Sequence, residues 1–353
     1  MNRLLRFFTT GEDKPLIQDQ GAVNRLYKKY RLNVMLAITV AYGFAYPLRL
    51  ALNVVKKPLI DSGIFTAMDL GNIGSALLYT YAFGKFTNGF LADHANVKRF
   101  FAVGVLVSAL INIAMGWSTV LWVWVVLWGL NGWFQAFGAP TGAVSLSNWF
   151  SNKERGRYYG IWSTGHCIGE GLTFIISSTI VAYWGWQSGF IIPGIFCVFL
   201  SIIIYFGMQD RPRTLGLPTV ADWKNDHGLI VVNENGEPVK TKTAQIEVLK
   251  MPSIWILGLA SAFMYMTRYA INSWGVLYLQ EAKGYSLVQA GGILGLNTFA
   301  GIAGCIVYGF ISDKIFNARR PPVTLIYGIL EILSLCVIFF SPPGHPVLLT
   351  ISF

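Results

Sequence analysis

Long apolar runs alternate with short polar connections over most of the 353-residue chain. Each run exceeds the ~17 residues that a helix needs to span a bilayer. They lie at about 33–54, 69–91, 100–118, 120–148, 157–184, 187–208, 253–279, 287–311 and 323–341, and a further run begins near Val347. Alternating segments of ~10 residues, typical of membrane barrels, are absent from the sequence. The pattern therefore predicts an all-α membrane protein.

One long polar segment divides the apolar runs into two groups. The predicted organisation is an N-terminal tail (1–32), a six-helix bundle (33–208), a linker loop (209–251) and a partial second bundle (252–353). An even number of helices before the linker gives both bundles the same orientation in the membrane.

The composition and the placement of charged residues indicate which kind of membrane protein this is. The chain is 54% hydrophobic and only 12% charged, with a net charge of +10. Most of its 27 lysines and arginines lie in the tail and in the connections after the second, fourth, sixth and eighth helices. This one-sided distribution follows the positive-inside rule. We therefore expect a multi-pass protein of the cytoplasmic (inner) membrane with a cytoplasmic N-terminus, whose partner is the lipid bilayer and not nucleic acid.

Two sequence motifs occur twice. YPLRLALN at 46–53 aligns with YMTRYAIN at 265–272, and GKFTNGFLAD, ending at Asp93, aligns with GCIVYGFISD, ending at Asp313. Both pairs are displaced by about 220 residues, which indicates a duplicated unit. The sequence thus predicts two parallel six-helix repeats, the second incomplete, with about nine to ten of twelve expected helices present.

Three basic residues fall inside predicted spans: Arg49, Lys85 and Arg268. An arginine near the middle of a bilayer costs at least ~2.5–3.5 kcal/mol, so it requires an explanation. Arg49 alone is explained by snorkelling, because its predicted span ends close by. Two arginines at matched depth in both repeats instead indicate a clamp for a small oxyanion, since guanidinium groups bind phosphate oxygens bidentately.

Other polar residues within or at the ends of predicted spans are candidate functional residues, but a structural interpretation is also open for them. His166 is either a packing histidine or a partner for Glu170, which lies one turn further along the helix and is a candidate for proton coupling. Asp93 and Asp313 follow the same glycine spacing at equivalent helix ends. They are either gating residues that pair with a loop cation or simply solvated carboxylates.

Catalytic chemistry is not indicated. The polar residues show no nucleophile–base arrangement and no metal-ligand spacing, so we expect neither an enzyme, nor a cofactor, nor a metal. The four cysteines all lie in predicted helices without CxxC spacing, and we expect small buried side chains there: Cys167, Cys197, Cys305 and Cys336.

From about Tyr27 onward the chain resembles the organophosphate–phosphate antiporters of the major facilitator superfamily, and most of all their hexose-phosphate sensor branch. The resemblance rests on Tyr-x-x-Arg at 46–49, AFGKF at 82–86, NGWFQAFGAP at 131–140, NWFSNKERG at 148–156, WSTGH at 162–166, DRPRTLGLP at 210–218, YMTRYAINSW at 265–274 and GFISDK at 309–314. It implies exchange of phosphorylated sugars for inorganic phosphate by alternating access. The substrate-binding residues that it implies are Arg49, Arg268, Lys85, His166, Tyr42, Tyr46, Tyr81 and Tyr265.

The chain also departs from the family pattern at several positions. Leu50 stands where the family has lysine, Ser163 replaces asparagine, Ser273 replaces aspartate, Thr298 replaces glutamate, and Glu170 interrupts a glycine run. The alternatives are a hexose-phosphate receptor of the same fold that signals to a membrane sensor kinase, and a truncated, inactive product. Fold and site would be shared by transporter and receptor, so the sequence does not decide between them.

Overall fold

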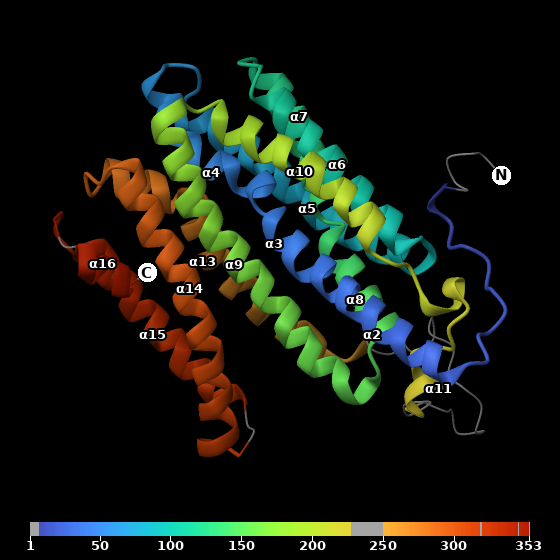
Figure 1. The fold of residues 1–353 in the computed structure, drawn as a ribbon. Coiled ribbons are helices and arrows are strands. Elements are labelled where there is room, and N and C mark those ends of the chain that lie inside the picture. Colours follow the sequence, from blue (N-terminus) through green and yellow to red (C-terminus); the bar gives the residue numbers. More distant parts are fainter. Residues whose placement is uncertain (1–6, 227–249, 318–319, 345, 353) are drawn as a thin grey trace.

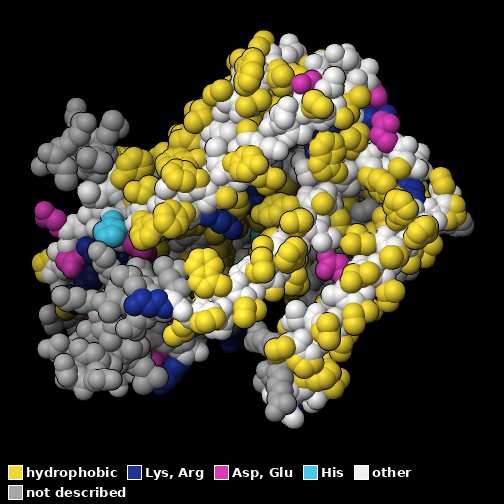
Figure 2. Space-filling model, turned by 180° about the vertical axis from the view of Figure 1, so that it is seen from behind, with side chains coloured by type: hydrophobic (Ala, Val, Ile, Leu, Met, Phe, Trp, Pro, Cys, Tyr) yellow, Lys and Arg dark blue, Asp and Glu magenta, His cyan; other side chains and the backbone are white. Residues whose placement is uncertain are grey.

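The computed structural model describes residues 7–226, 250–317, 320–344 and 346–352, which fold as helices joined by short turns (Figure 1). Among these residues, seven helices are long and apolar enough to cross a membrane. Hydrophobic side chains cover most of the face shown in Figure 2, and basic side chains are visible where that face is hollowed. The prediction of an all-α membrane protein is confirmed.

The first apolar run forms a rod that is longer than predicted. It consists of α2 (Gln20–Leu36), the π-helical turn η1 (Ala37–Ala41), α3 (Tyr42–Phe44) and α4 (Pro47–Asp61). The rod begins inside the predicted tail, where the Asp19 side chain accepts a hydrogen bond from the Gly21 N–H at 2.8 Å. Proline has no N–H, and Pro47 stands at the first position of α4, where none is needed. Because the rod continues to Asp61, Arg49 does not lie close to the end of its helix, as the snorkelling interpretation requires.

The remaining elements follow the predicted order. They are α5 (Ala67–His94), α6 (Val97–Met115), α7 (Leu121–Gln135), α8 (Gly138–Trp149), α9 (Asn152–Trp184), α10 (Ser188–Gly207), η2 (Pro212–Leu215), α11 (Val220–Lys224), α13 (Pro252–Glu281), α14 (Leu287–Phe310), η3 (Ile311–Ile315), α15 (Arg320–Phe340) and α16 (Pro346–Ser352). The predicted helix 120–148 is divided into α7 and α8 by a turn at residues 136 and 137.

Helix α9 lies between the rod and α14 (Figure 1), and glycines allow close approach on both sides. A Cβ added at Gly165 would lie 2.6 Å from the Thr39 carbonyl oxygen, and one at Gly169 would collide with the Gly43 carbonyl. On the other side, a Cβ at Gly291 of α14 would lie 2.6 Å from the Phe174 carbonyl oxygen. Small residues at helix contacts permit this spacing in membrane proteins. The backbone of α9 is therefore held closely between the rod, which belongs to the same bundle, and α14, which belongs to the second bundle.

The segment 209–226, which the sequence assigned to the linker, packs against the end of the bundle. The Tyr27 ring stacks on Trp223 at 4.0 Å, and its hydroxyl donates to the Pro218 carbonyl at 2.6 Å. Asp210 accepts a hydrogen bond from the Val97 N–H at 2.8 Å and so caps α6, although burial raises the pKa of its carboxyl group. These contacts explain why α2 is helical so far ahead of the predicted span. Residues 227–249 of the predicted linker lie outside the described part of the chain.

Two lysines join the halves near the opposite end of α4. Lys56 and Lys57 follow the end of the predicted span at residue 54, but both lie inside α4, and Lys56 is only 1% exposed. The Lys56 ammonium donates to the Ser273 carbonyl at 2.7 Å and lies 3.5 Å from the centre of the Trp274 ring. Lys57 forms an ion pair with Glu281 at 2.6 Å. We call these contacts between α4 and α13 the end latch.

Candidate functional site

A cavity of about 220 Å³ lies between the halves, lined mainly by α4, α5, α9 and α13. All eight substrate-binding residues proposed from the sequence line it: Tyr42, Tyr46, Arg49, Tyr81, Lys85, His166, Tyr265 and Arg268. Glu170, the proton-coupling candidate, also lines it. The fold thus brings together side chains that lie more than two hundred residues apart in the chain, and the repeated arginines enter one cavity from the two halves.

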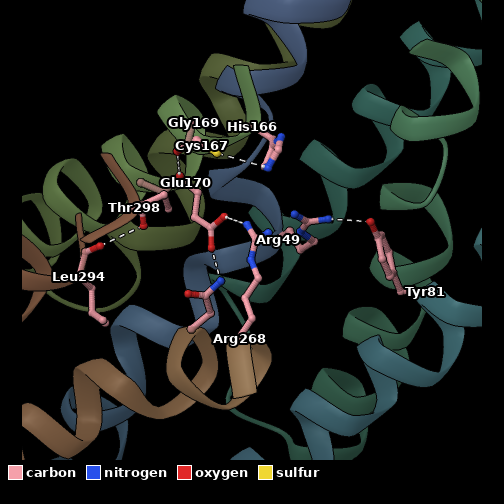
Figure 3. A network of polar contacts seen from close by, with 11 residues as sticks. Arg49, Tyr81, His166, Cys167, Gly169, Glu170, Arg268, Leu294 and Thr298 are labelled. Carbon is pink, nitrogen blue, oxygen red and sulfur yellow. Dashed lines mark hydrogen bonds and ion pairs between the residues drawn. The ribbon is translucent and has the colours of Figure 1, made fainter. Parts of the chain in front are cut away.

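Arg49 is surrounded by tyrosines. Its Nη1 donates to the Tyr81 hydroxyl at 2.8 Å (Figure 3). The Arg49 guanidinium also lies 4.3 Å from the centre of the Tyr46 ring. Within the described residues, no carboxylate lies within ion-pair distance of Arg49. A cation in such a place is stabilised by the aromatic faces and remains available to an anionic guest.

A buried polar network supports the backbone next to Arg49. The Leu48 carbonyl accepts hydrogen bonds from the Asn112 side chain at 3.0 Å and from the Asn131 side chain at 2.8 Å. Ser108 donates to Asn131 at 2.5 Å, and Gln135 donates to Ser108 at 2.6 Å. Sequence reasoning missed this network, although asparagines inside apolar runs were a visible signal for hydrogen bonds between helices.

Arg268 is held by a carboxylate. Its Nη2 lies 2.7 Å from Glu170 Oε2, and the Asn272 side-chain amide donates to the other carboxylate oxygen (Figure 3). Of the two interpretations of His166, the pair with Glu170 is not formed in this conformation, because Glu170 is bonded to Arg268 and Asn272 instead. Four residues apart on one helix, the two side chains are near neighbours, but Arg268 supplies the stronger, charge-assisted partner.

His166 and Lys85 complete the basic lining. The His166 ring stacks near Tyr46, with 6.3 Å between ring centres, and its Nε2 is 3.4 Å from the sulfur of Cys167. Lys85 is exposed to the cavity, and its ammonium lies 5.0 Å from the centre of the Tyr81 ring. Because Glu170 balances the charge of Arg268, the positive excess of the cavity comes from Arg49 and Lys85, and this excess suits an anion carrying more than one charge.

Asp93, the first of the two aspartates with repeated glycine spacing, does not line the cavity. Asp93 is exposed near the end of α5 and forms no ion pair within the described residues. Asp313 falls in η3, and its side chain lies outside the described part of the structure. Their role in gating stays a prediction. The residues that the structure describes contain no cluster of histidine, cysteine and carboxylate side chains able to hold a metal ion.

The family is shown by comparison with known proteins. Residues 30–353 match the sequence model of the Major Facilitator Superfamily, and the chain belongs to this family of membrane transporters. It is an integral membrane protein, as its apolar helices require.

Three named relatives show which members of this family the chain resembles. The chain is 33% identical over 340 residues to the membrane sensor protein UhpC of Escherichia coli, covering 96% of this chain and 77% of that relative. It is 32% identical over 351 residues to a probable hexose phosphate transport protein of Chlamydia pneumoniae (97% and 77%). It is 31% identical over 335 residues to a glycerol-3-phosphate transporter of Bacillus subtilis (93% and 75%). The resemblance to organophosphate transporters and their sensor relative is confirmed.

A solved structure supports the fold independently. The inward-facing, unoccupied form of a bacterial homologue of the human lysosomal transporter Spinster superposes with a TM-score of 0.73 at 18% identity, covering 92% of this chain and 72% of that one. At this identity the similarity concerns the fold alone.

Proposed function

We propose that this protein carries phosphorylated sugars or related phosphate esters across the cytoplasmic membrane in exchange for inorganic phosphate, with its N-terminus in the cytoplasm. The relatives named for hexose phosphate and glycerol 3-phosphate support the substrate class. The one-sided distribution of basic residues supports the orientation.

The observation that carries this proposal is the pair of arginines in one cavity. Arg49 comes from α4 in the first half and Arg268 from α13 in the second. A phosphoryl group held by both guanidiniums would draw the halves together around the cavity, and so favours the rocking of one half against the other that alternating access requires. Phosphate esters have a second pKa near 6 and carry one or two negative charges near neutral pH, which two fixed arginines compensate.

A receptor function is the second candidate, and similarity to the membrane sensor protein UhpC favours it. A receptor would use the same arginines to bind a hexose phosphate and would pass the signal to a membrane kinase without turnover. Binding and exchange must therefore be measured separately.

The test uses purified protein in liposomes loaded with phosphate, with uptake of labelled phosphate as the readout and glucose 6-phosphate as competitor. We expect Arg49→Lys and Arg268→Lys each to reduce exchange by roughly 10- to 150-fold, because an ammonium cannot replace a bidentate guanidinium and a charged hydrogen bond is worth about 1.5–3 kcal/mol. Arg25→Lys is the matched control, because Arg25 is an exposed arginine outside the cavity.

The possible results of this experiment distinguish the antiporter from the receptor. Exchange that requires phosphate inside the liposome and is lost in both cavity variants supports the antiporter. Binding of glucose 6-phosphate without exchange supports the receptor. Wild-type exchange by either cavity variant would refute the arginine clamp.

A further inference from the structure

Glu170 is a buried carboxylate placed where an anionic guest is expected. Its side chain is 3% exposed, and it bonds to Arg268 and Asn272, both on α13. The carboxylate thus occupies the donors of one of the two clamp arginines, as a phosphate oxygen would. In effect it is an internal anion in the site.

The two partners of this ion pair differ in freedom to move. Glu170 lies on α9 between Gly169, which contacts the Gly43 carbonyl, and Gly171, whose added Cβ would lie 3.1 Å from the Gly295 carbonyl oxygen. Its backbone is therefore fixed by close contacts on both sides. The Arg268 side chain is 43% exposed, so it has room to turn away from Glu170 toward a guest in the cavity.

Among the described residues, no cation other than Arg268 lies within ion-pair distance of Glu170. The other ionisable groups lining either of the two cavities that Glu170 borders are Tyr42, Tyr46, Arg49, Tyr81, Lys85, Tyr159, His166, Cys167, Tyr265, Tyr269, Cys305, Tyr327 and Glu331. Arg49 is bonded to Tyr81, and the His166 imidazole is in contact with Cys167. Without Arg268, the carboxylate keeps only the neutral amide of Asn272, and a buried carboxylate without a cation favours its protonated form.

We propose that Glu170 competes with the substrate phosphate for Arg268 and takes up one proton from solution when the phosphate displaces it. The inference rests on the proposed function, because it assigns a proton to the same binding step. In this step the anion enters with its own charge, the Arg268–Glu170 pair opens, and one proton binds a carboxylate oxygen of Glu170. Substrate and proton would then cross together.

Proton uptake on binding predicts the direction in which the apparent Kd changes with pH. If binding takes up one proton, the apparent Kd rises by up to tenfold for each unit of rising pH. A phosphate ester has its second pKa near 6 and is almost entirely dianionic above pH 7.5, so its own titration does not contribute there. The experiment therefore uses glucose 6-phosphate at pH 7.5, 8.0 and 8.5.

Isothermal titration calorimetry at pH 8.0, in two buffers with different heats of ionisation, counts the protons. We expect the wild type to take up about one proton per glucose 6-phosphate bound. Glu170→Gln should bind with no proton uptake, at least about tenfold more tightly, and with a Kd independent of pH, because its amide no longer competes as an anion. Glu331→Gln is the matched control, since Glu331 borders the neighbouring cavity, and it should keep the wild-type proton uptake.

A second variant and the wild-type measurement test the proposal even if Glu170→Gln does not fold. If Glu170→Gln is not monodisperse, Glu170→Ala tests the same loss of charge, and the wild-type proton count does not depend on any variant. Binding by the wild type with no proton uptake would overturn this inference and leave the proposed function standing. Absence of both glucose 6-phosphate binding and phosphate exchange would overturn the proposed function itself.

Discussion

The repeated arginines occupy equivalent places in the sequence but have different surroundings. Arg49 donates to a phenol and lies against aromatic rings, whereas Arg268 is paired with a buried carboxylate. An unpaired guanidinium is the stronger attraction for an incoming anion, since no internal anion must first be displaced. We therefore expect a phosphate to meet Arg49 first and to recruit Arg268 afterwards.

Tyr81 orients Arg49, and its removal tests this order. Tyr81→Phe deletes the 2.8 Å hydrogen bond to Arg49 Nη1 but keeps the ring. One such bond contributes about 0.5–1.5 kcal/mol, so we expect glucose 6-phosphate to bind roughly 2- to 12-fold more weakly, measured by calorimetry. Tyr79→Phe on the same helix is the control, because Tyr79 is 79% exposed and does not line the cavity. Equal affinities for the two variants would contradict the role of Tyr81.

At the scale of single residues, the sequence identified the charges but not all of their partners. Arginines in apolar runs are visible because burying them is expensive, and the repeat showed that Arg49 and Arg268 belong together. The pairing of Arg268 with Glu170 depends on how α9 and α13 cross, and local spacing favoured His166 instead. Lys56 was misplaced for a related reason, because its partners Ser273 and Trp274 belong to the other half.

At the scale of elements, the contact between α9 and the rod fixes the site. Gly169 leaves no room for a methyl group against the Gly43 carbonyl, whereas a Cβ at Gly160 on the same helix would meet nothing within 4 Å. We expect Gly169→Ala to lower stability by about 1–3 kcal/mol through overpacking. Gly160→Ala should be neutral or slightly stabilising, because alanine favours helix over glycine by about 1 kcal/mol.

Thermal unfolding of both variants in one detergent checks this prediction. A clear fall in Tm for Gly169→Ala beside an unchanged or higher Tm for Gly160→Ala is the expected pair of results. Equal Tm values would show that α9 can move away from the rod, and the argument that Glu170 is held in place would then fail.

Helix boundaries show the limit of sequence reasoning at this scale. Hydropathy located the apolar core of each helix, because lipid exposure selects for it. It could not show that α2 extends back to Gln20, since that stretch is polar and is held by Tyr27 against the distant segment 209–226. Nor did it show the turn between α7 and α8, which falls inside one continuous apolar run.

At the scale of the whole molecule, the end latch holds the two halves together near one end of α4 and α13. Lys57→Glu should weaken it by placing like charges opposite each other, and Lys57→Glu combined with Glu281→Lys should restore it. Exposed ion pairs contribute about 0.2–1 kcal/mol, so we expect the ratio of open to closed forms at this end to change roughly 1.4- to fivefold.

Distances between spin labels report this change. Labels on Ser62→Cys and Ala282→Cys, two exposed positions near the latch, would be measured by double electron–electron resonance with Cys305 and Cys336 replaced by serine. A longer-distance population in the single variant that disappears in the double variant is the expected result. Identical distributions in all three proteins would rule out a contribution of the Lys57–Glu281 pair to the latch.

The length of the first rod has a mechanical consequence. It runs for 42 residues, from Gln20 to Asp61, which is about 63 Å of helix and about twice the ~30 Å hydrocarbon core. Gln20 stands roughly 44 Å along this rod from Arg49. A tilt of only about 5° at the cavity would therefore sweep the far end through about 4 Å, by the geometry of a rigid lever. Small movements around Arg49 would therefore be enlarged near the far end of the rod, where the buried Tyr27 stacks on Trp223.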